Sequence, residues 1–210
     1  MRHNIIILAN SRKMRNRCIA GVDVQNGAWV RPCFETGEEG IPWSIRKIDN
    51  AEPQLLDIIA IPLANDGPHR DIQPENRSLS EGVWEKVDRT TIKQVLKYRQ
   101  KSGTILHNTE RRIHISKLQT VHERERKSLC MIQTNVVFTT EASFTGKKRV
   151  VAAFEHYGVK YRIPVTDYEF EHAFPPYNTR EAECLLTVSL GMPYEMDNYC
   201  YKLVAGVIEL

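Results

Sequence analysis

The chain has 210 residues, of which 41% are hydrophobic and 26% charged, so it can bury the core of one large domain or two small ones. Its formal net charge is only +3, which excludes a chain that is basic throughout, and a polyanionic partner must be argued from where charges cluster. No apolar run approaches the roughly 18 residues of a membrane span, and the short apolar stretch near the N-terminus does not suit a secretion signal.

The cysteines are odd in number and widely spaced: Cys18, Cys33, Cys130, Cys184 and Cys200. They form no C-x-x-C pair of the kind used for zinc binding or dithiol chemistry. We therefore expect reduced thiols in a cytoplasmic protein without membrane contact.

The first thirty residues predict a β meander. Residues 5–8 are a β-branched apolar run, residues 18–22 alternate in polarity, and Gln25-Asn26-Gly27 is the strongest hairpin signal in the chain. A third strand opens at Trp29. A long loop over 35–53, with a turn of helix near 43–45, and a strand over 55–63 are expected to follow.

One longer helix is predicted over 90–101, because Ile92, Val95 and Leu96 share a face and Thr90 can cap the N-terminus. A second β-rich block begins near residue 112. Its expected elements are strands over 113–121, 129–140, 150–154, 160–165, 185–190 and 201–210, and a short helix opened by Asn178 and Glu181.

These patterns predict a mostly β fold with a few short helices, organised as two small β-barrels in tandem. The expected domains are 1–103, with the helix at its end, and 112–210. Strands that are not separated by regular helices argue against a doubly wound α/β sheet.

Positive charge is concentrated between the first two predicted strands. Arg12, Lys13, Arg15 and Arg17 fall within six positions, and the first 31 residues contain one acidic residue, Asp23. Arginine can meet phosphate oxygens in bidentate fashion, and each basic contact to a phosphate releases a condensed counterion. The connector therefore predicts contact with nucleic acid, with nearby aromatic residues as stacking platforms.

The candidate nucleic-acid-binding residues are Ser11, Arg12, Lys13, Arg15, Arg17, Trp29, Arg31 and, in a second basic turn, Lys147, Lys148 and Arg149. The sequence indicates no cofactor, metal or catalytic residue, because the common nucleophile, phosphate-loop and metal-binding motifs are absent. The pattern favours a binding module over an enzyme.

The strings "ILANSRKMRNRCIAGVDV", "WVRP", "LLDIIAIPL" and "QPEN", with the C-terminal "YKLVAGVIEL", resemble the dual OB-fold domain family of bacterial proteins. The resemblance implies two consecutive OB-type barrels. It also implies a nucleic-acid-binding or nucleic-acid-sensing module, a recognition component of a prokaryotic defence system that can pass recognition to an effector protein.

Three alternatives stay open at this point. The first is a nucleotide-binding module and the second a protein-interaction module, because OB-like barrels also accept such ligands. The third is a hydrolase acting on nucleic acid, for which His69, Asp71, Glu75 and His114 would have to meet in one pocket.

Overall fold

The computed structural model describes residues 1–36, 39–101, 103–142, 146, 148–176 and 178–210. Contacts within the chain divide it into two compact units: Met1–Arg70 with Pro74–Tyr98, and Asp71–Gln73 with Arg99–Leu210. Thus residues 99–111 belong to the second unit, and so does the short segment 71–73, although the residues on both sides of that segment belong to the first.

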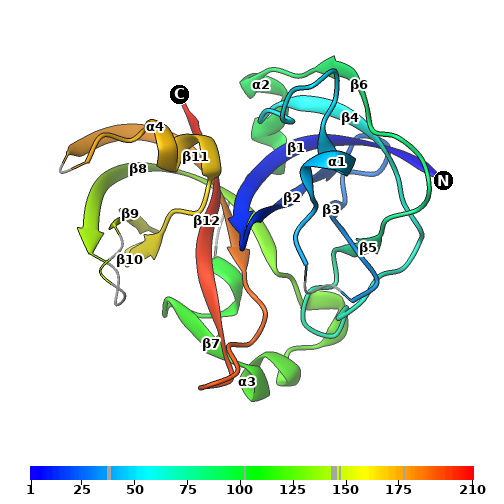
Figure 1. Ribbon diagram of the computed structural model, residues 1–210. Coiled ribbons are helices and arrows are strands. Elements are labelled where there is room, and N and C mark those ends of the chain that lie inside the picture. The colour runs from blue at the N-terminus through cyan, green and yellow to red at the C-terminus, as the bar shows by residue number, and fades with distance from the viewer. Residues whose placement is uncertain (37–38, 102, 143–145, 147, 177) are drawn as a thin grey trace. The chain divides into compact units, whose positions relative to one another are not determined.

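The first unit is a sheet with the strand order β5-β3-β2-β1-β4-β6 (Figure 1). Its elements are β1 (Arg2–Lys13), β2 (Asn16–Asp23), β3 (Trp29–Cys33), α1 (Trp43–Arg46), β4 (Asp57–Pro62), β5 (Asn76–Ser78), β6 (Glu85–Arg89) and α2 (Ile92–Val95), followed by a 3₁₀ turn at Leu96–Tyr98.

This sheet closes into a barrel. β3 and β5 run parallel, and an antiparallel bridge joins Leu63 to Leu79 directly after β4 and β5. The strands therefore form a ring in the order β1-β2-β3-β5-β4, a five-stranded Greek-key barrel of the OB type. The apolar run of β1 contributes Ile5 and Ile7 to its core, where both are fully buried.

The second unit repeats this plan in the sheet β10-β9-β8-β11-β12-β7. Its elements are β7 (Arg112–His114), α3 (Ile115–Thr120), β8 (Leu129–Ala142), β9 (Lys148–His156), β10 (Val159–Pro164), α4 (Tyr168–Ala173), β11 (Thr179–Leu190) and β12 (Tyr199–Glu209), with 3₁₀ turns at Ile105–His107 and Glu123–Glu125. A parallel bridge between Val165 and Val204 closes the ring β8-β9-β10-β12-β11.

Each ring thus has the same strand order, and each carries a short helix between its third and fourth strands, α1 in one unit and α4 in the other. The expectation of a mostly β fold with two OB-like barrels in tandem is confirmed. The predicted Gln25-Asn26-Gly27 hairpin is confirmed as well: Gly27 has φ +72° and its N–H donates to the Asp23 carbonyl at 2.8 Å.

Several predicted helices and strands are wrong in type or extent. The helix expected over 90–101 ends at Tyr98. At its N-terminus the Gln94 side chain accepts from the Thr91 N–H at 3.0 Å. It ends there because Arg99 is drawn into a parallel bridge with Met131.

The strand expected over 113–121 turns into α3 after His114, whose imidazole accepts from the Ser116 N–H at 3.3 Å. The expected helix at 178–181 is instead the start of β11, where Thr179 pairs with Thr139 of β8. Pairing with a neighbouring strand overrides the local capping signal there.

Candidate nucleic-acid interface

The basic connector predicted from the sequence is the tight turn between β1 and β2. Arg12 pairs with Arg17 and Lys13 with Asn16 across the hairpin, so Met14 and Arg15 form its tip. Arg12 and Arg15 are exposed, Lys13 is half-buried, and the exposed fraction of Met14 is 85%. The hairpin therefore presents two arginine side chains to solvent beside a lysine.

Two of the predicted contact residues on the hairpin face inward. Arg17 is buried, its Nη2 lies 3.9 Å from Glu52 Oε1, and its backbone forms a bridge with Ile41. Ser11 is also buried, and its hydroxyl donates to the Cys18 carbonyl at 3.3 Å. Both side chains hold the hairpin against its own unit and are withdrawn from the surface that a polymer can reach.

Arg31 of β3 is buried too, and it positions neighbouring residues. Its Nη1 donates to Asn76 Oδ1 at 3.1 Å and thereby ties β3 to β5. Burial raises the pKa of the Cys33 thiol to about 11, and the charges of Arg31 and Lys13 oppose that rise. The charges of the hairpin lysine and the β3 arginine therefore both act on the Cys33 thiol.

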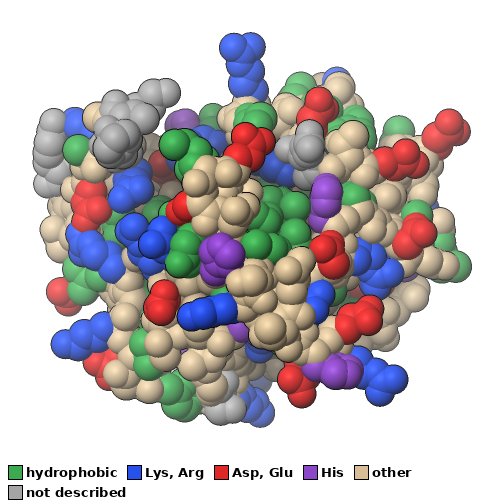
Figure 2. Space-filling view, turned by 90° about the horizontal axis from the view of Figure 1, so that it is seen from below, with side chains coloured by type: hydrophobic (Ala, Val, Ile, Leu, Met, Phe, Trp, Pro, Cys, Tyr) green, Lys and Arg blue, Asp and Glu red, His purple; other side chains and the backbone are tan. Residues whose placement is uncertain are grey.

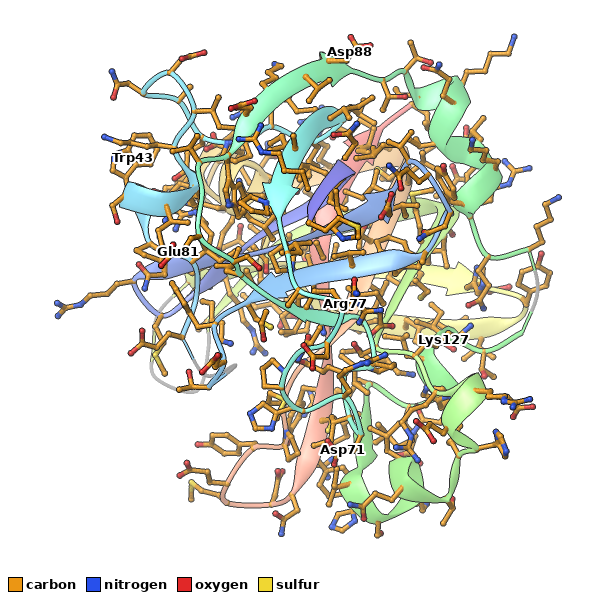
Figure 3. All side chains as sticks on the ribbon, turned by 90° about the vertical axis from the view of Figure 1, so that its right-hand side faces the viewer. Trp43, Asp71, Arg77, Glu81, Asp88 and Lys127 are labelled. Carbon is orange, nitrogen blue, oxygen red and sulfur yellow. The ribbon has the colours of Figure 1, made fainter. Side chains whose placement is uncertain are left out.

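Two further arginines lie nearby: Arg70 at the end of the β4–β5 connection and Arg77 in β5. Neither was predicted from the sequence as a contact residue. Arg77, which Figure 3 labels, donates to the carbonyls of Pro74 at 3.1 Å and Asn76 at 2.8 Å. Burial and then the nearby charge of Arg70 lower the Arg77 pKa, so the two guanidinium groups are close enough to repel each other. The only feature of the sequence that could have indicated these two arginines is that they lie on either side of the "QPEN" stretch.

Trp29 does not lie near the hairpin tip. It pairs with Val22, and Val22 lies six residues further along β2 than Asn16, a span of about 20 Å. The structure therefore leaves the predicted aromatic platform at the opposite end of β2 from the exposed arginines.

Three basic side chains at one edge of the first sheet are paired with acids. Arg2 lies 2.7 Å from Glu85, while Lys86 and Arg89 both reach Asp57, at 2.8 Å and 2.7 Å. These pairs lie along β1, β4 and β6, so their charges largely cancel at that edge of the sheet.

The second predicted basic turn joins β8 to β9. These are the first two strands of the second ring, so the turn corresponds to the β1–β2 hairpin of the first ring. Lys147 lies outside the described residues, and Lys148 is exposed. Arg149 lies 3.9 Å from Glu141, which also pairs with Arg162. Glu141 therefore offsets part of the positive charge beside this turn.

Figure 2 shows one face of the molecule on which acidic and basic side chains are intermixed.

Two of the side chains considered for catalysis, His69 and His114, have structural partners, and a third, Glu75, is buried. His69 contacts the Thr36 carbonyl at 2.8 Å, Glu75 is buried, and the His114 imidazole caps α3. Among the described residues, no group of three or more His, Cys, Asp or Glu side chains is placed to hold a metal ion.

Comparison with known proteins places the chain in a family. A model of the dual OB-containing domain matches residues 3–207, so the chain belongs to the dual OB-containing domain family. No curated protein matches the sequence significantly.

Two solved structures are weakly similar. One is the tetrameric p202 HIN2, with 9% identity over 99% of this chain and 94% of that chain and a TM-score of 0.31. The other is a murine DNA-binding protein bound with double-stranded DNA, with 10% identity over the whole of both chains and a TM-score of 0.30. Neither likeness is close enough to bear on function.

In the part of the chain that the structure describes, no helix is both long and apolar enough to cross a membrane.

Proposed function

We propose that the first barrel binds nucleic acid through a basic face made of Arg12, Lys13, Arg15, Arg70 and Arg77. OB-type barrels bind oligonucleotides over their second and third strands and the loops between strands one and two and strands four and five. The basic face takes its side chains from the corresponding places: the β1–β2 hairpin, β5 beside β3, and the end of the β4–β5 connection.

The observation that carries this proposal is the convergence of three separate segments on Cys33. Lys13, Arg31 and Arg77 each interact electrostatically with its thiol, and the thiol donates to the Arg77 carbonyl at 3.4 Å. Glu75 and Asp66 also act on Arg77 and offset part of this charge, so the exposed hairpin arginines, Arg12 and Arg15, supply the main attraction for an anionic partner. Exposed arginines at the rim can then meet successive phosphates.

Replacing both exposed hairpin arginines, Arg12→Ser with Arg15→Ser, should weaken binding to oligonucleotides and flatten its salt dependence. Loss of two phosphate contacts should reduce the slope of log K against log[salt] by about 1.4 for single strands and about 1.8 for duplex DNA. Fluorescence anisotropy with single- and double-stranded DNA and RNA at four salt concentrations measures both quantities.

The matched control is Lys93→Ser with Lys97→Ser, which removes two exposed charges of α2 and the 3₁₀ turn from the same unit. It should leave the slope nearly unchanged. The proposal fails if the arginine pair and the lysine pair lower affinity and slope equally, because the charge effect would then be non-specific.

Trp29, Lys148 and Arg149 stay predicted contacts and are secondary to the basic face. A recognition role in a prokaryotic defence system, with an effector protein as partner, rests on the family resemblance and also stays a prediction. The identity of the neighbouring genes, and copurification with their products, tests that role.

A further inference from the structure

The second unit contains an open cleft of about 680 Å³ that is separate from the basic face. Its walls come from residues 99–101, the first half of β8, the end of β9 with its turn, and Glu183 of β11. All these segments belong to one unit. A volume of this size is typical of sites that take a small molecule.

Tyr157, on the rim of this cleft, occupies a turn position that suits other residue types. Tyr157 and Gly158 form a two-residue turn between β9 and β10, with φ +49° and +77°. Both values are those of a type I′ turn, which favours Asn-Gly, and a bulky aromatic residue is strained there. The exposed fraction of Tyr157 is 62%, so burial of the ring does not offset the strain. The ring packs edge-on against His156, with centroids 4.7 Å apart, and the residue lines the cleft. A strained residue at a cleft points to function.

His156 supplies a buried polar atom that has no partner within the described part of the chain. The residue is 5% exposed, lines the cleft, and its Nε2 accepts or donates no hydrogen bond. Burial lowers the pKa of the imidazole below its usual value, so the ring is neutral at pH 7 and offers one donor and one acceptor. This nitrogen is covered from solvent, and the ring packs edge-on against Tyr157 with centroids 4.7 Å apart, so His156 supports the Tyr157 ring from below the surface.

The floor of the cleft is ordered by a chain of hydrogen bonds. Arg99 donates to Gln133 Oε1, and Gln133 Nε2 donates to Glu183 Oε1 at 2.8 Å. Asn135 lies directly opposite Glu183 on the paired strands β8 and β11. Amides and carboxylates are the groups that hydrogen-bond to base edges, and Lys101 at the rim adds a positive charge for a phosphate.

The lining balances two basic residues, Arg99 and Lys101, against two acidic ones, Glu155 and Glu183. Such a balance does not suit a phosphate backbone that runs through the cleft. It suits a ligand with a flat polar ring and a single anionic group. The exposed tyrosine and the amides match that description together.

We propose that this cleft binds one unpaired nucleobase, stacked on Tyr157 and hydrogen-bonded by the β8 amides. The base can belong to a free nucleotide or to an unpaired position of a nucleic-acid strand. The site lies outside the basic face, and its affinity rests on stacking more than on counterion release.

Tyr157→Asn tests this directly, because asparagine fits φ > 0 better than tyrosine and removes only the ring. The variant should fold with an unfolding temperature at or above that of the wild type. Its affinity should fall about 5- to 150-fold, the range that base–aromatic stacking carries. Tyr157→Phe keeps the ring and should stay within about threefold of the wild type.

The probes are the four nucleoside 5′-monophosphates, measured by calorimetry, and a single-stranded 12-mer, measured by anisotropy. If Tyr157→Asn weakens the binding of mononucleotides, the site takes free nucleotides. Loss for the 12-mer alone assigns it to bases of a strand. In either case binding should shift the ring ¹⁵N resonances of His156.

Equal affinity of Tyr157→Asn and wild type for both probes, or no binding of either probe, would overturn the inference. The result is separable from the proposed function, because Tyr157→Asn should leave the salt slope unchanged whereas Arg12→Ser with Arg15→Ser should flatten it.

Discussion

Glu52→Ala is expected to lower the free energy of unfolding of the first unit by about 3–5 kcal/mol, the cost of breaking a buried ion pair from one side. Glu52 accepts from Arg46 Nε at 2.8 Å and Nη2 at 2.6 Å, and lies 3.9 Å from Arg17 Nη2. Arg46 and Arg17 are both buried. The substitution therefore leaves two buried guanidinium groups without their carboxylate.

Loss of this ion pair should also loosen the proposed interface, because Arg17 lies in β2 two residues after the hairpin tip. All three tryptophans of the chain, Trp29, Trp43 and Trp84, lie in the first unit. Tryptophan fluorescence during urea unfolding therefore reports on that unit alone.

The control is Glu81→Ala, which removes an exposed carboxylate of the same unit and should change stability by less than about 0.5 kcal/mol. Equal unfolding midpoints for Glu52→Ala and Glu81→Ala would show that Glu52 does not hold the two arginines.

Lys202→Met is expected to have an effect that changes strongly with pH. Lys202 is 1% exposed, and its Nζ donates to the backbone carbonyl of Asn108 at 2.6 Å and to the Asn108 side chain at 2.8 Å. Burial lowers the pKa of this amine from 10.5 to about 8. The native state thus disfavours the charged amine, although it uses the amine as a donor.

The sign of the pH effect follows from proton binding. Between the native pKa of about 8 and the unfolded value near 10.5, the unfolded chain binds more protons, so Lys202 makes stability rise with pH over that window. The wild type should therefore gain on the order of 3 kcal/mol relative to Lys202→Met between pH 7 and pH 10.5. Near pH 7 the two should be similar, because relief of the buried charge offsets the two lost hydrogen bonds.

Calorimetric unfolding at the two pH values measures this difference, and taking it between variants cancels the titration of the cysteines and tyrosines. Lys160→Met removes an exposed lysine of β10 and serves as the control. A stability gap between wild type and Lys202→Met that is constant with pH would contradict the account of Lys202.

The predicted elements succeed where the determining contacts are local. The run Ile5–Leu8 and the Gln25-Asn26-Gly27 turn set their own structure within a few residues, and both are found as predicted. The basic connector is likewise a hairpin with Arg12 and Arg15 exposed.

The predictions fail where distant segments decide. Arg17 is buried because Ile41 and Glu52 return to the hairpin from after β3, which no local pattern reveals. Arg70 and Arg77 join the basic face because β3 and β5 pair in parallel and Arg31 bonds to Asn76, 45 residues away. A short polar stretch such as "QPEN" gives no sign of that pairing.

The central claim is that the basic face of the first barrel contacts nucleic acid. Photo-crosslinking of the full chain to an oligonucleotide with 5-iodouracil bases, mapped by mass spectrometry, tests it most directly. We expect crosslinked peptides that contain Arg12–Arg15 or residues 70–77. Crosslinks in the first unit confined to β6 and α2, with none in the hairpin, would contradict the claim.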